Sequence, residues 1–367
     1  MTPLRSMEDL EPLRAEWDAL AQHTGAHKPF MSWEWLRACA EQERQRIEPY
    51  VVVERDGSSV QAIGPFGRVG RMPGWRRVVF LGGTQSDYQT VLTQPGRPDA
   101  ATNVWKVLLA QTDWDRIDLY PIAESEAAQV SALAQAHRGL TVAYRAKGNC
   151  PVLDLSDGAV ERDGQKMLKD AQYQWRRMEK MGVTLQRAET ADDLRKLLDG
   201  LADLHRRRWA VESQASRFSQ DARQMEFERL ASVWLEQGVL HATGLSVGGR
   251  LIAAHIGACT ADRFYWHTPS FDPEFSKYSP GKVLVWRLVE ECRARGVRWF
   301  DFLRGAEEYK TAWGAVPTAP YGRLTILRAW VANVHLPFIE DRASYFSSRA
   351  KWRLAQVLGT ASHGGAG

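Results

Sequence analysis

The sequence predicts an α/β protein of the α+β type, built from two domains. Its 367 residues are more than one average core usually holds, which makes two domains the default expectation. Hydrophobic residues make up 44% of the chain, a content that suits globular packing. Patterns typical of helices and of strands alternate along both halves, with no low-complexity tract or proline-rich linker. We therefore expect both domains to be folded.

The first half begins with helices and continues with strands. Leu10, Leu13, Trp17 and Leu20 repeat at three and four residues, which predicts an amphipathic helix. Ser32 is a suitable N-cap for a second helix. The period then changes to that of strands separated by Gly and Asp turns, and these runs are expected to form a meander: residues 50–54, 60–66 and 77–81. A helix over 101–111 and a strand over 116–121 end this half.

The second half begins with a charged helix over 164–181, which we interpret as a bridge between the domains. Its apolar positions repeat with helical spacing. The remaining elements are expected in this order: helices 192–209 and 227–237, strands 240–247, 251–260 and 263–267, helix 280–295, strand 298–303, helix 307–313 and strand 322–329. This half therefore combines a three-strand meander with flanking helices.

The two halves echo each other weakly. Val104-Trp105-Lys106 precedes Ile117-Asp118-Leu119, and Val285-Trp286-Arg287 precedes Phe300-Asp301-Phe302. The Trp and the Asp are separated by a similar number of residues in both pairs. This pattern is consistent with an internal duplication.

Charge and cysteine content exclude some classes of protein. The net charge is only +4, which does not favour nucleic acid as a partner. Six basic and two acidic residues lie in the segment 323–353, so this segment alone matches the excess of the whole chain. The four cysteines have no paired spacing, so neither a zinc site nor a disulfide framework is indicated: Cys39, Cys150, Cys259 and Cys292.

The N-terminus indicates where the protein resides. Residues 1–14 lack a basic region followed by an apolar core, so nothing marks the chain for secretion. No apolar run approaches the length of about 20 residues that a membrane-spanning helix needs. We expect a cytoplasmic protein of a reducing compartment.

The most informative local segment is Tyr278-Ser279-Pro280-Gly281-Lys282, at the expected start of a helix. Ser279 is placed to cap this helix, and Pro280 fits the first helical position, where its missing N–H costs nothing. The free N–H groups of a helix start attract anions, and Gly281 would allow close approach of a pyrophosphate. An ordinary, well-capped helix without a ligand is the alternative.

Motifs spread over nearly the whole chain carry a family resemblance, and the run from Phe300 to Lys310 is the most specific. Further motifs are Pro29-Phe30, Trp33-Glu34-Trp35, Phe80-Leu81-Gly82, Asp87-Tyr88, Trp114-Asp115, Cys150-Pro151, Trp175-Arg176-Arg177 and Trp313-Gly314. With them, the chain resembles the GNAT-like acyltransferases related to cellulose-biosynthesis CelD proteins and to Fem-type aminoacyl transferases.

The resemblance implies tandem GNAT-like domains, each with a mixed, mostly antiparallel sheet flanked by helices. The boundaries expected are 1–150 for the N-terminal domain, 151–190 for the bridging segment and helix, 191–335 for the C-terminal domain and 336–367 for a C-terminal helix and tail. Acyl-CoA would bind as a co-substrate in the C-terminal domain, through Tyr278 to Lys282. No tightly bound cofactor is expected. The glycine-rich consensus of ordinary GNAT enzymes is shortened here to Ser279-Pro280-Gly281.

Transfer of an acyl group from a thioester requires a base, oxyanion donors and an acid for the thiolate, and it requires no metal. His255 lies in a strand of small and apolar residues, where an imidazole is costly unless it is paired. It is either the general base or a satisfied core histidine. His267, at the end of the next strand, is the other candidate, and a water relay remains a third.

The run that carries the resemblance holds further candidates. Asp301 either orients the base or pairs structurally, with Arg304 or Lys310 as the suggested partners. The resemblance implies that Tyr309 protonates the leaving thiolate and that Lys310 meets substrate charge. Arg304 and Glu307 belong to the same expected substrate site.

A helical trio completes the expected site. His205, Arg208 and Trp209 are spaced by three and four residues, which places His205 beside both partners on one face. They are expected to bind a polar or anionic acceptor. A surface charge cluster beside a buried tryptophan is the alternative.

The sequence as a whole therefore predicts a bacterial, acyl-CoA-dependent N-acyltransferase. The acceptor is an amino sugar or glycan precursor, a small amine, or a lipid amine such as a sphingoid base. An aminoacyl-tRNA-dependent Fem-like ligase and a non-catalytic scaffold of polysaccharide or lipid synthesis are the alternatives. Basic and aromatic residues alternate after residue 336, a pattern compatible with peripheral contact at the inner membrane or with an ordinary terminal helix.

Overall fold

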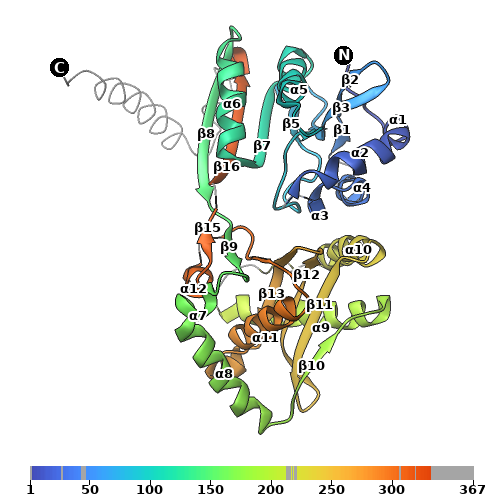
Figure 1. Ribbon diagram of the computed structural model, residues 1–367. Coiled ribbons are helices and arrows are strands. Elements are labelled where there is room, and N and C mark those ends of the chain that lie inside the picture. Colours follow the sequence, from blue (N-terminus) through green and yellow to red (C-terminus); the bar gives the residue numbers. More distant parts are fainter. Residues whose placement is uncertain are drawn as a thin grey trace, which may run out of the picture. The chain divides into compact units, whose positions relative to one another are not determined.

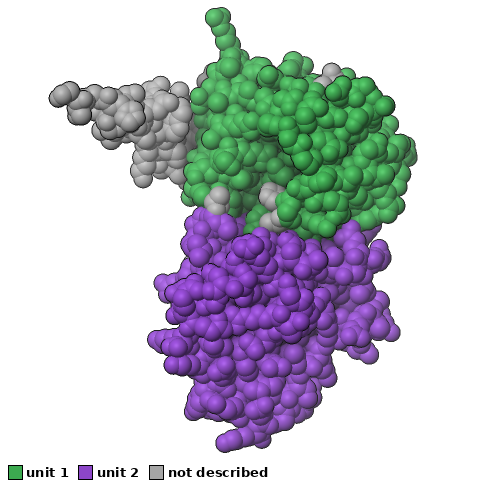
Figure 2. All heavy atoms as spheres, viewed as in Figure 1, with its two compact units in different colours: residues 1–147, 320–367 green, residues 148–319 purple. Residues whose placement is uncertain are grey.

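The computed structural model describes residues 2–331, except for 26–27, 43–46, 212–215, 217, 219–220, 306 and 319. The expected C-terminal helix and tail, 336–367, lie outside the described residues. The chain divides into two compact units, which Figure 2 shows in green and purple. Unit 1 comprises Met1–Lys147 together with Pro320–Gly367, and unit 2 comprises Gly148–Ala319. None of the described helices combines the length and hydrophobicity needed to cross a bilayer.

Unit 1 begins with short helices and continues into two sheets (Figure 1). The helices are α1 (Met7–Leu10), α2 (Arg14–Gln22), α3 (Lys28–Met31) and α4 (Trp33–Gln42), with a 3-10 turn over Glu11–Leu13. Ser32 caps α4 as predicted, since its hydroxyl accepts the N–H of Trp35 at 3.3 Å. The first two turns of this region bury Leu10, Leu13 and Trp17.

The predicted meander of unit 1 is wrong, because Pro65 divides it between two sheets. Strands β2 (Val52–Asp56), β3 (Ser59–Gly64) and β6 (Leu92–Thr93) form a three-stranded sheet. Strands β4 (Phe66–Val69) and β5 (Arg77–Phe80) belong instead to a six-stranded sheet. Proline has no N–H to donate to a ladder, so the expected strand over 60–66 ends at Gly64 and begins anew at Phe66.

The six-stranded sheet has the order β1-β4-β5-β7-β16-β8. Its other members are β1 (Glu48–Pro49), β7 (Arg116–Ala123), β8 (Leu140–Gly148) and β16 (Tyr321–Arg328). Helix α6 (Glu124–Gln135) packs on it against β7 and β16, whereas α5 (Pro98–Ala110) packs on the three-stranded sheet. The buried side chains of Trp105, Trp114 and Phe66 are among those at the centre of its core.

The last strand, β16, lies in unit 1, although the sequence placed residues 322–329 in a C-terminal domain of 191–335. It pairs with β7 in antiparallel register, with Thr325 opposite Asp118, and it neighbours β8 on its other side. Unit 2 is therefore inserted in the chain between two neighbouring strands of unit 1. Sequence order alone cannot reveal such a return of the chain.

Unit 2 is built on a seven-stranded sheet with the order β10-β11-β12-β13-β14-β9-β15. The strands are β9 (Pro151–Asp154), β10 (Val183–Arg187), β11 (Leu240–Val247), β12 (Arg250–Cys259), β13 (Arg263–Phe271), β14 (Trp299–Asp301) and β15 (Val316–Pro317). Its helices are α7 (Ala159–Arg162), α8 (Gln165–Glu179), α9 (Ala191–Val211), α10 (Asp221–Glu236), α11 (Pro280–Ala294) and α12 (Glu308–Ala312). A 3-10 turn, η3, covers Pro273–Tyr278.

The segment 151–190, expected to bridge two domains, is an integral part of unit 2. Strand β9 pairs with β14, and β10 pairs with β11 at the edge of the sheet. Helix α8 packs along α11 through Ala171 and Met178, which are fully buried. An amphipathic helix buries its apolar stripe against a core, and here that core belongs to unit 2.

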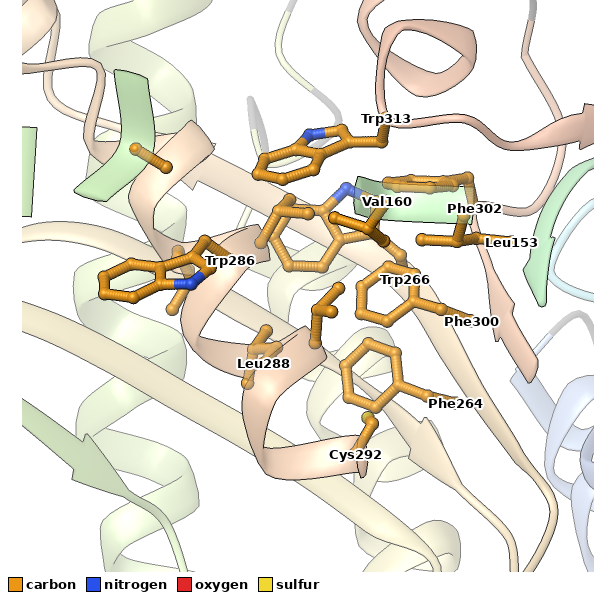
Figure 3. Close-up of a cluster of buried hydrophobic side chains, with 14 of the residues drawn as sticks. Leu153, Val160, Phe264, Trp266, Trp286, Leu288, Cys292, Phe300, Phe302 and Trp313 are labelled. Carbon is orange, nitrogen blue, oxygen red and sulfur yellow. The ribbon is translucent and has the colours of Figure 1, made fainter. Parts of the chain in front are cut away.

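Aromatic side chains fill the core beneath α11. Phe264, Phe300 and Phe302 come from adjacent strands and their extensions, and their rings stack or tilt against one another at 4.6 to 4.9 Å (Figure 3). Leu288 and Cys292 of α11 face these rings. This packing holds α11 firmly on β13 and β14.

The two units share one structural motif. In unit 1, β5 and β7 are parallel neighbours with α5 between them in sequence, and in unit 2 β13 and β14 are parallel neighbours with α11 between them. In both, an arginine at the start of the first strand pairs with an aspartate in the second. The pairs are Arg77 with Asp118 at 3.6 Å and Arg263 with Asp301 at 2.9 Å. This correspondence agrees with the sequence echo around Trp105 and Trp286.

Candidate functional site

The turn before α11 has an uncommon backbone conformation. Ser279 is left-handed, with φ of 47° and ψ of 52°, and its carbonyl accepts the N–H of Val283 at 3.1 Å. The hydroxyl of Ser279 makes no capping bond, so the predicted side-chain cap is wrong. A non-glycine residue in this conformation is strained, and such strain is found preferentially at functional sites. Pro280 occupies the first helical position, as predicted.

Gly281 keeps the first turn of α11 open. A methyl group at this position would meet only the ring of Phe271, at 3.6 Å, which is an ordinary contact distance. The N–H groups of a first helical turn have no acceptor within their own helix. The backbone at Gly281 is therefore accessible to an anion.

A cavity of about 250 Å³ adjoins this turn within unit 2. Its walls are mainly apolar and come from β13, α11 and α12, with single residues from α8 and α9. The lining residues are Met167, Arg208, Trp266, Pro269, Ser270, Phe271, Gly281, Lys282, Leu284, Val285, Tyr309 and Trp313. The site thus joins a helix start to a narrow apolar hollow.

Two polar atoms in the cavity wall lack hydrogen-bond partners among the described residues: Oγ of Ser270 and Nε1 of Trp313. Ser270 is 3% exposed and Trp313 is fully buried. A buried polar group without a partner costs about 1–3 kcal/mol, so such groups usually serve a ligand or an ordered water. Because both atoms lie in the wall of one narrow cavity, they favour a thin, extended ligand that carries polar groups along its length.

Tyr309 supplies a hydroxyl to the same cavity. Its oxygen accepts the indole N–H of Trp266 at 3.1 Å. Burial raises the pKa of the Tyr309 hydroxyl well above its usual range, while the Trp266 N–H acts weakly in the opposite direction. The hydroxyl therefore remains protonated at neutral pH and can donate a proton.

Lys282 lines the cavity but is already paired. Its Nζ hydrogen-bonds Oδ2 of Asp170, which lies on α8, and this bond lowers the pKa of that carboxyl group. The ion pair fixes α8 against the first turn of α11. Lys282 therefore contributes much less net charge to an anion site than a solitary lysine would.

Asp272 holds the turn before α11 through a second set of ion pairs. The sequence did not single out this residue. Its carboxylate is fully buried, accepts the Glu274 N–H, and pairs with Arg207 of α9 at 2.9 Å and with Arg250. Burial opposes its ionisation, but the hydrogen bonds from Glu274, Arg250 and Arg207 outweigh that effect and lower its pKa. Its sequence signal was the Asp272-Pro273 dipeptide, which favours the start of a turn.

The structure does not bring the two proposed bases to the cavity. His255 is fully buried, stacks on Trp266 at 4.4 Å, and lies with Nε2 at 3.1 Å from the N–H of His267 and 3.2 Å from the carbonyl of Tyr265. Burial lowers the pKa of His255 well below its usual range. A general base must come within hydrogen-bond reach of its proton, and this ring is enclosed. Its enclosure fits a core histidine, although Nδ1 of the ring has no hydrogen-bond partner among the described residues.

His267 also turns away from the cavity lining. Its ring stacks on Phe227 of α10 at 5.8 Å and meets Trp234 edge-on at 5.3 Å. The backbone pairing between β12 and β13 shifts register between Ile256 and Ala258, opposite Trp266 and His267. Successive residues of a strand point to opposite faces, so Trp266 lines the cavity while the ring of His267 faces α10.

The run from Phe300 to Lys310 forms a tightly bonded loop. Asp301 is fully buried, pairs with Arg263 and accepts the N–H of Leu303 at 2.8 Å. Leu303 has a positive φ of 55°, an uncommon conformation for a branched residue. The ion pair that the structure shows for Asp301 is with Arg263, which lies at the start of the neighbouring strand β13, whereas the sequence suggested Arg304 or Lys310.

Lys310 is buried inside this loop and bonds to its backbone. It is 3% exposed, donates to the carbonyl of Arg304 at 2.8 Å and pairs with Glu307 at 2.8 Å. These bonds tie Lys310 and Glu307 to the loop next to Tyr309. The expected contact of either residue with substrate stays a prediction.

The predicted trio on α9 separates into two environments. His205 is buried, stacks on Trp209 at 5.3 Å and shares a hydrogen bond of 2.9 Å with the hydroxyl of Ser216. Arg208 instead lies over the ring of Phe271 at 4.7 Å and lines the cavity. Of the three, only Arg208 borders the cavity.

Unit 1 has a larger hollow of about 390 Å³, but its charge is unsuited to an anion. Four carboxylates line it, from Glu8, Glu11, Glu41 and Glu48, together with Arg37. Arg37 is paired with Glu41 at 3.0 Å. We therefore place the candidate site in unit 2.

Residues 165–311 match the acetyltransferase (GNAT) domain family. This segment of the chain is a GNAT-type domain. The matched segment begins with α8 and ends in α12, so it contains every residue that lines the unit 2 cavity except Trp313. No curated protein matches the chain in sequence.

Solved structures extend the likeness to both units. FemX shares 10% identity with a TM-score of 0.61, covering 89% of this chain and 98% of its own. A conserved protein of unknown function from Bacteroides thetaiotaomicron shares 11% identity with a TM-score of 0.57, covering 86% and 97%. The C-terminal domain of a putative lysylphosphatidylglycerol synthetase from Agrobacterium fabrum shares 15% identity with a TM-score of 0.52, covering 88% and 95%. At these identities the likeness concerns the fold alone.

These findings confirm the predicted class, a mixed α/β protein with two mixed sheets flanked by helices, and its Fem-like tandem GNAT architecture. The protein is a GNAT-fold, acyltransferase-like chain.

Proposed function

We propose that unit 2 transfers an acyl group from a coenzyme A thioester to an amine. The observation that carries this proposal is the pairing of an open helix start at Gly281 with a narrow apolar cavity that contains two unpartnered polar atoms. A pyrophosphate suits the first turn of α11. The thin, amide-bearing arm of coenzyme A suits the cavity, where Ser270 and Trp313 offer hydrogen bonds.

In this proposal the thioester lies beside Tyr309. The amine nitrogen attacks the thioester carbonyl carbon, the C–S bond breaks, and the thiolate takes the proton of Tyr309. The nitrogen, which carries an extra proton after the attack, returns one proton to the tyrosinate. The tyrosine thus moves a proton from nucleophile to leaving group, and neither His255 nor His267 is needed as the base.

The acceptor remains an amine of three candidate classes: an amino sugar or glycan precursor, a small amine, and a lipid amine such as a sphingoid base. An aminoacyl-tRNA donor is the competing proposal, because FemX shares the fold. Titration calorimetry with coenzyme A, acetyl-CoA, a long-chain acyl-CoA and aminoacyl-tRNA separates these donors.

Gly281 provides the first test. Gly281→Ala should keep wild-type affinity for coenzyme A, since a methyl group fits against Phe271, whereas Gly281→Val should weaken it by about tenfold or more by filling the approach to the backbone. Ala191→Val is the matched control, because it adds a branched side chain to the exposed first turn of α9. Unchanged affinity in a folded Gly281→Val variant would remove the helix start from the donor site.

Ser270 provides an independent companion variant. Ser270→Ala removes an unpartnered buried hydroxyl, so the melting temperature should stay level or rise while donor affinity falls several-fold. A loss of stability without a loss of affinity would show that the hydroxyl serves the fold and not the donor.

A further inference from the structure

Two cations beside the turn before α11 lack acidic partners, in contrast to their neighbours. Asp272 pairs with Arg207 and Arg250, and Asp170 pairs with Lys282. Among the residues that the structure describes, Arg177 and Lys277 form no ion pair with a carboxylate. The neighbourhood of the turn therefore keeps positive charge at these two side chains.

Arg177 is held in place although it is not neutralised. It lies on α8, with its guanidinium 4.6 Å from the ring centroid of Tyr278 and 5.8 Å from that of Tyr173. One of its nitrogens donates to Gln174 at 2.9 Å and to the carbonyl of Lys277 at 3.4 Å. The ammonium of Lys277 lies 5.1 Å from the Tyr278 ring. Both cations therefore flank Tyr278, two residues before the helix start.

The size of the cavity indicates which part of the donor lies beside Arg177 and Lys277. About 250 Å³ is too small for a whole nucleotide-bearing cofactor, since sites for drug-sized ligands span roughly 300–1,000 Å³. The nucleotide must then rest outside the cavity, beyond the pyrophosphate. In coenzyme A the ribose that carries the pyrophosphate also carries a phosphate on its 3′-hydroxyl, so the two anionic groups are one sugar apart.

We infer that Arg177 and Lys277 form a subsite for the 3′-phosphate of coenzyme A on the rim of the donor site. This inference rests on the proposed function. A phosphate between a guanidinium and an ammonium makes charge-assisted hydrogen bonds with both. The subsite selects a donor that bears this phosphate over one that carries only the phosphopantetheine arm.

The test compares coenzyme A with 3′-dephospho-coenzyme A by titration calorimetry on the full-length protein. The wild-type chain should bind coenzyme A about tenfold more tightly. Arg177→Ala and Lys277→Ala should each lower this ratio, and the double variant should bring it close to one. Arg176→Ala is the matched control, because it removes the same charge from the adjacent, exposed position of α8 and should leave the ratio unchanged.

The ratio of the two affinities shows whether Arg177 recognises the 3′-phosphate or only supports the turn. If Arg177 only supports the turn through Gln174 and Lys277, its loss weakens both ligands equally and the ratio persists, which overturns the inference. Equal binding of both ligands by the wild-type chain also overturns it, while leaving the proposed function intact. Failure of the wild-type chain to bind either ligand contradicts the proposed function itself.

Discussion

At the residue scale, the site depends on side chains whose environment changes their ordinary chemistry. Trp266 lines the cavity, and its indole N–H donates a hydrogen bond to the hydroxyl of Tyr309. Sequence reasoning identified Tyr309 and Gly281 through their motifs. It selected His255 because a histidine in an apolar strand is conspicuous, and it could not show that the backbone N–H of His267 already donates to Nε2 of this ring.

The same reasoning missed the residues that act through contacts between distant segments. Asp170 and Arg177 meet the turn before α11 from α8, and Asp272 meets it from the residue after β13. In the sequence, Asp170 and Asp272 look like ordinary surface charges, and Arg177 is noted only as part of the Trp175-Arg176-Arg177 motif. Their importance follows from tertiary contacts, which no local pattern encodes.

We predict that Tyr309→Phe lowers the rate constant of acyl transfer by about 10²-fold or more while donor affinity stays near that of the wild type, because a general acid acts in the transition state. Since burial raises the pKa of this hydroxyl, its protonated form persists through neutral and mildly alkaline pH, and the acid should impose no activity loss there. Steady-state kinetics over a pH series measures both effects. A stable Tyr309→Phe variant with wild-type turnover would contradict the role.

At the element scale, the run that carries the family resemblance is explained largely by structure. The loop after β14 reverses direction through Leu303, and both Asp301 and Lys310 bond its backbone. Its function is to place α12, and with it Tyr309, against Trp266. A motif that looks catalytic in sequence is therefore mostly the support of one catalytic candidate.

Most elements of unit 2 were predictable because their periods are long and regular. The strand over Leu240–Val247 has the predicted bounds, and the helix predicted over 280–295 ends one residue earlier, at Ala294. Strand β13 is longer than predicted, since it continues past His267 to Phe271. Its bulge interrupts the alternation of side chains, so periodicity could not follow it.

The anchor of the turn before α11 gives a prediction at this scale. Asp272→Asn should lower the free energy of unfolding at neutral pH by about 2 kcal/mol, because it removes charge-assisted bonds from Arg207 and Arg250. The folded-state pKa of Asp272 is depressed, so its contribution is complete above the unfolded-state value of about 3.9 and is lost as the pH falls through the folded-state value. The difference between variant and wild type should therefore be constant from about pH 5 to 8 and shrink in acid.

Urea unfolding at several pH values measures this difference. Asp192→Asn is the control, because that carboxylate is exposed at the start of α9 and should change stability by less than about 0.5 kcal/mol. A difference for Asp272→Asn that persists unchanged in strong acid would assign its effect to packing instead of charge.

At the scale of the whole molecule, the chain contains one motif twice, and unit 2 is inserted between two strands of the six-stranded sheet of unit 1. The parallel pairs β5–β7 and β13–β14 have the same helix connection and the same arginine–aspartate pair, which supports an origin by duplication. The sequence revealed this echo. It did not reveal that the chain returns to unit 1 after unit 2, because β16 carries no sign of which sheet it joins.

The insertion makes a prediction that sequence-based boundaries would not make. Strands β8 and β16 are neighbours in the six-stranded sheet, and the N–H of Ala329 donates to the carbonyl of Gly139 at 2.7 Å, while Gly322 lies against the carbonyl of Arg145. The end of β8 and the start of β16 therefore lie close together. A short Asn-Gly turn that joins residue 147 directly to residue 320 should close a hairpin and yield a folded unit 1 without unit 2.

A chain of residues 1–147 alone should not fold cooperatively. It lacks β16, so it exposes the edge of β7 and loses the buried side chains of Leu324 and Ile326 from the core. Circular dichroism and urea unfolding compare this chain with the joined one, 1–147 plus 320–331. A cooperative transition for residues 1–147 alone would show that β16 is dispensable, whereas a transition confined to the joined chain would establish unit 2 as an insertion within a self-sufficient fold.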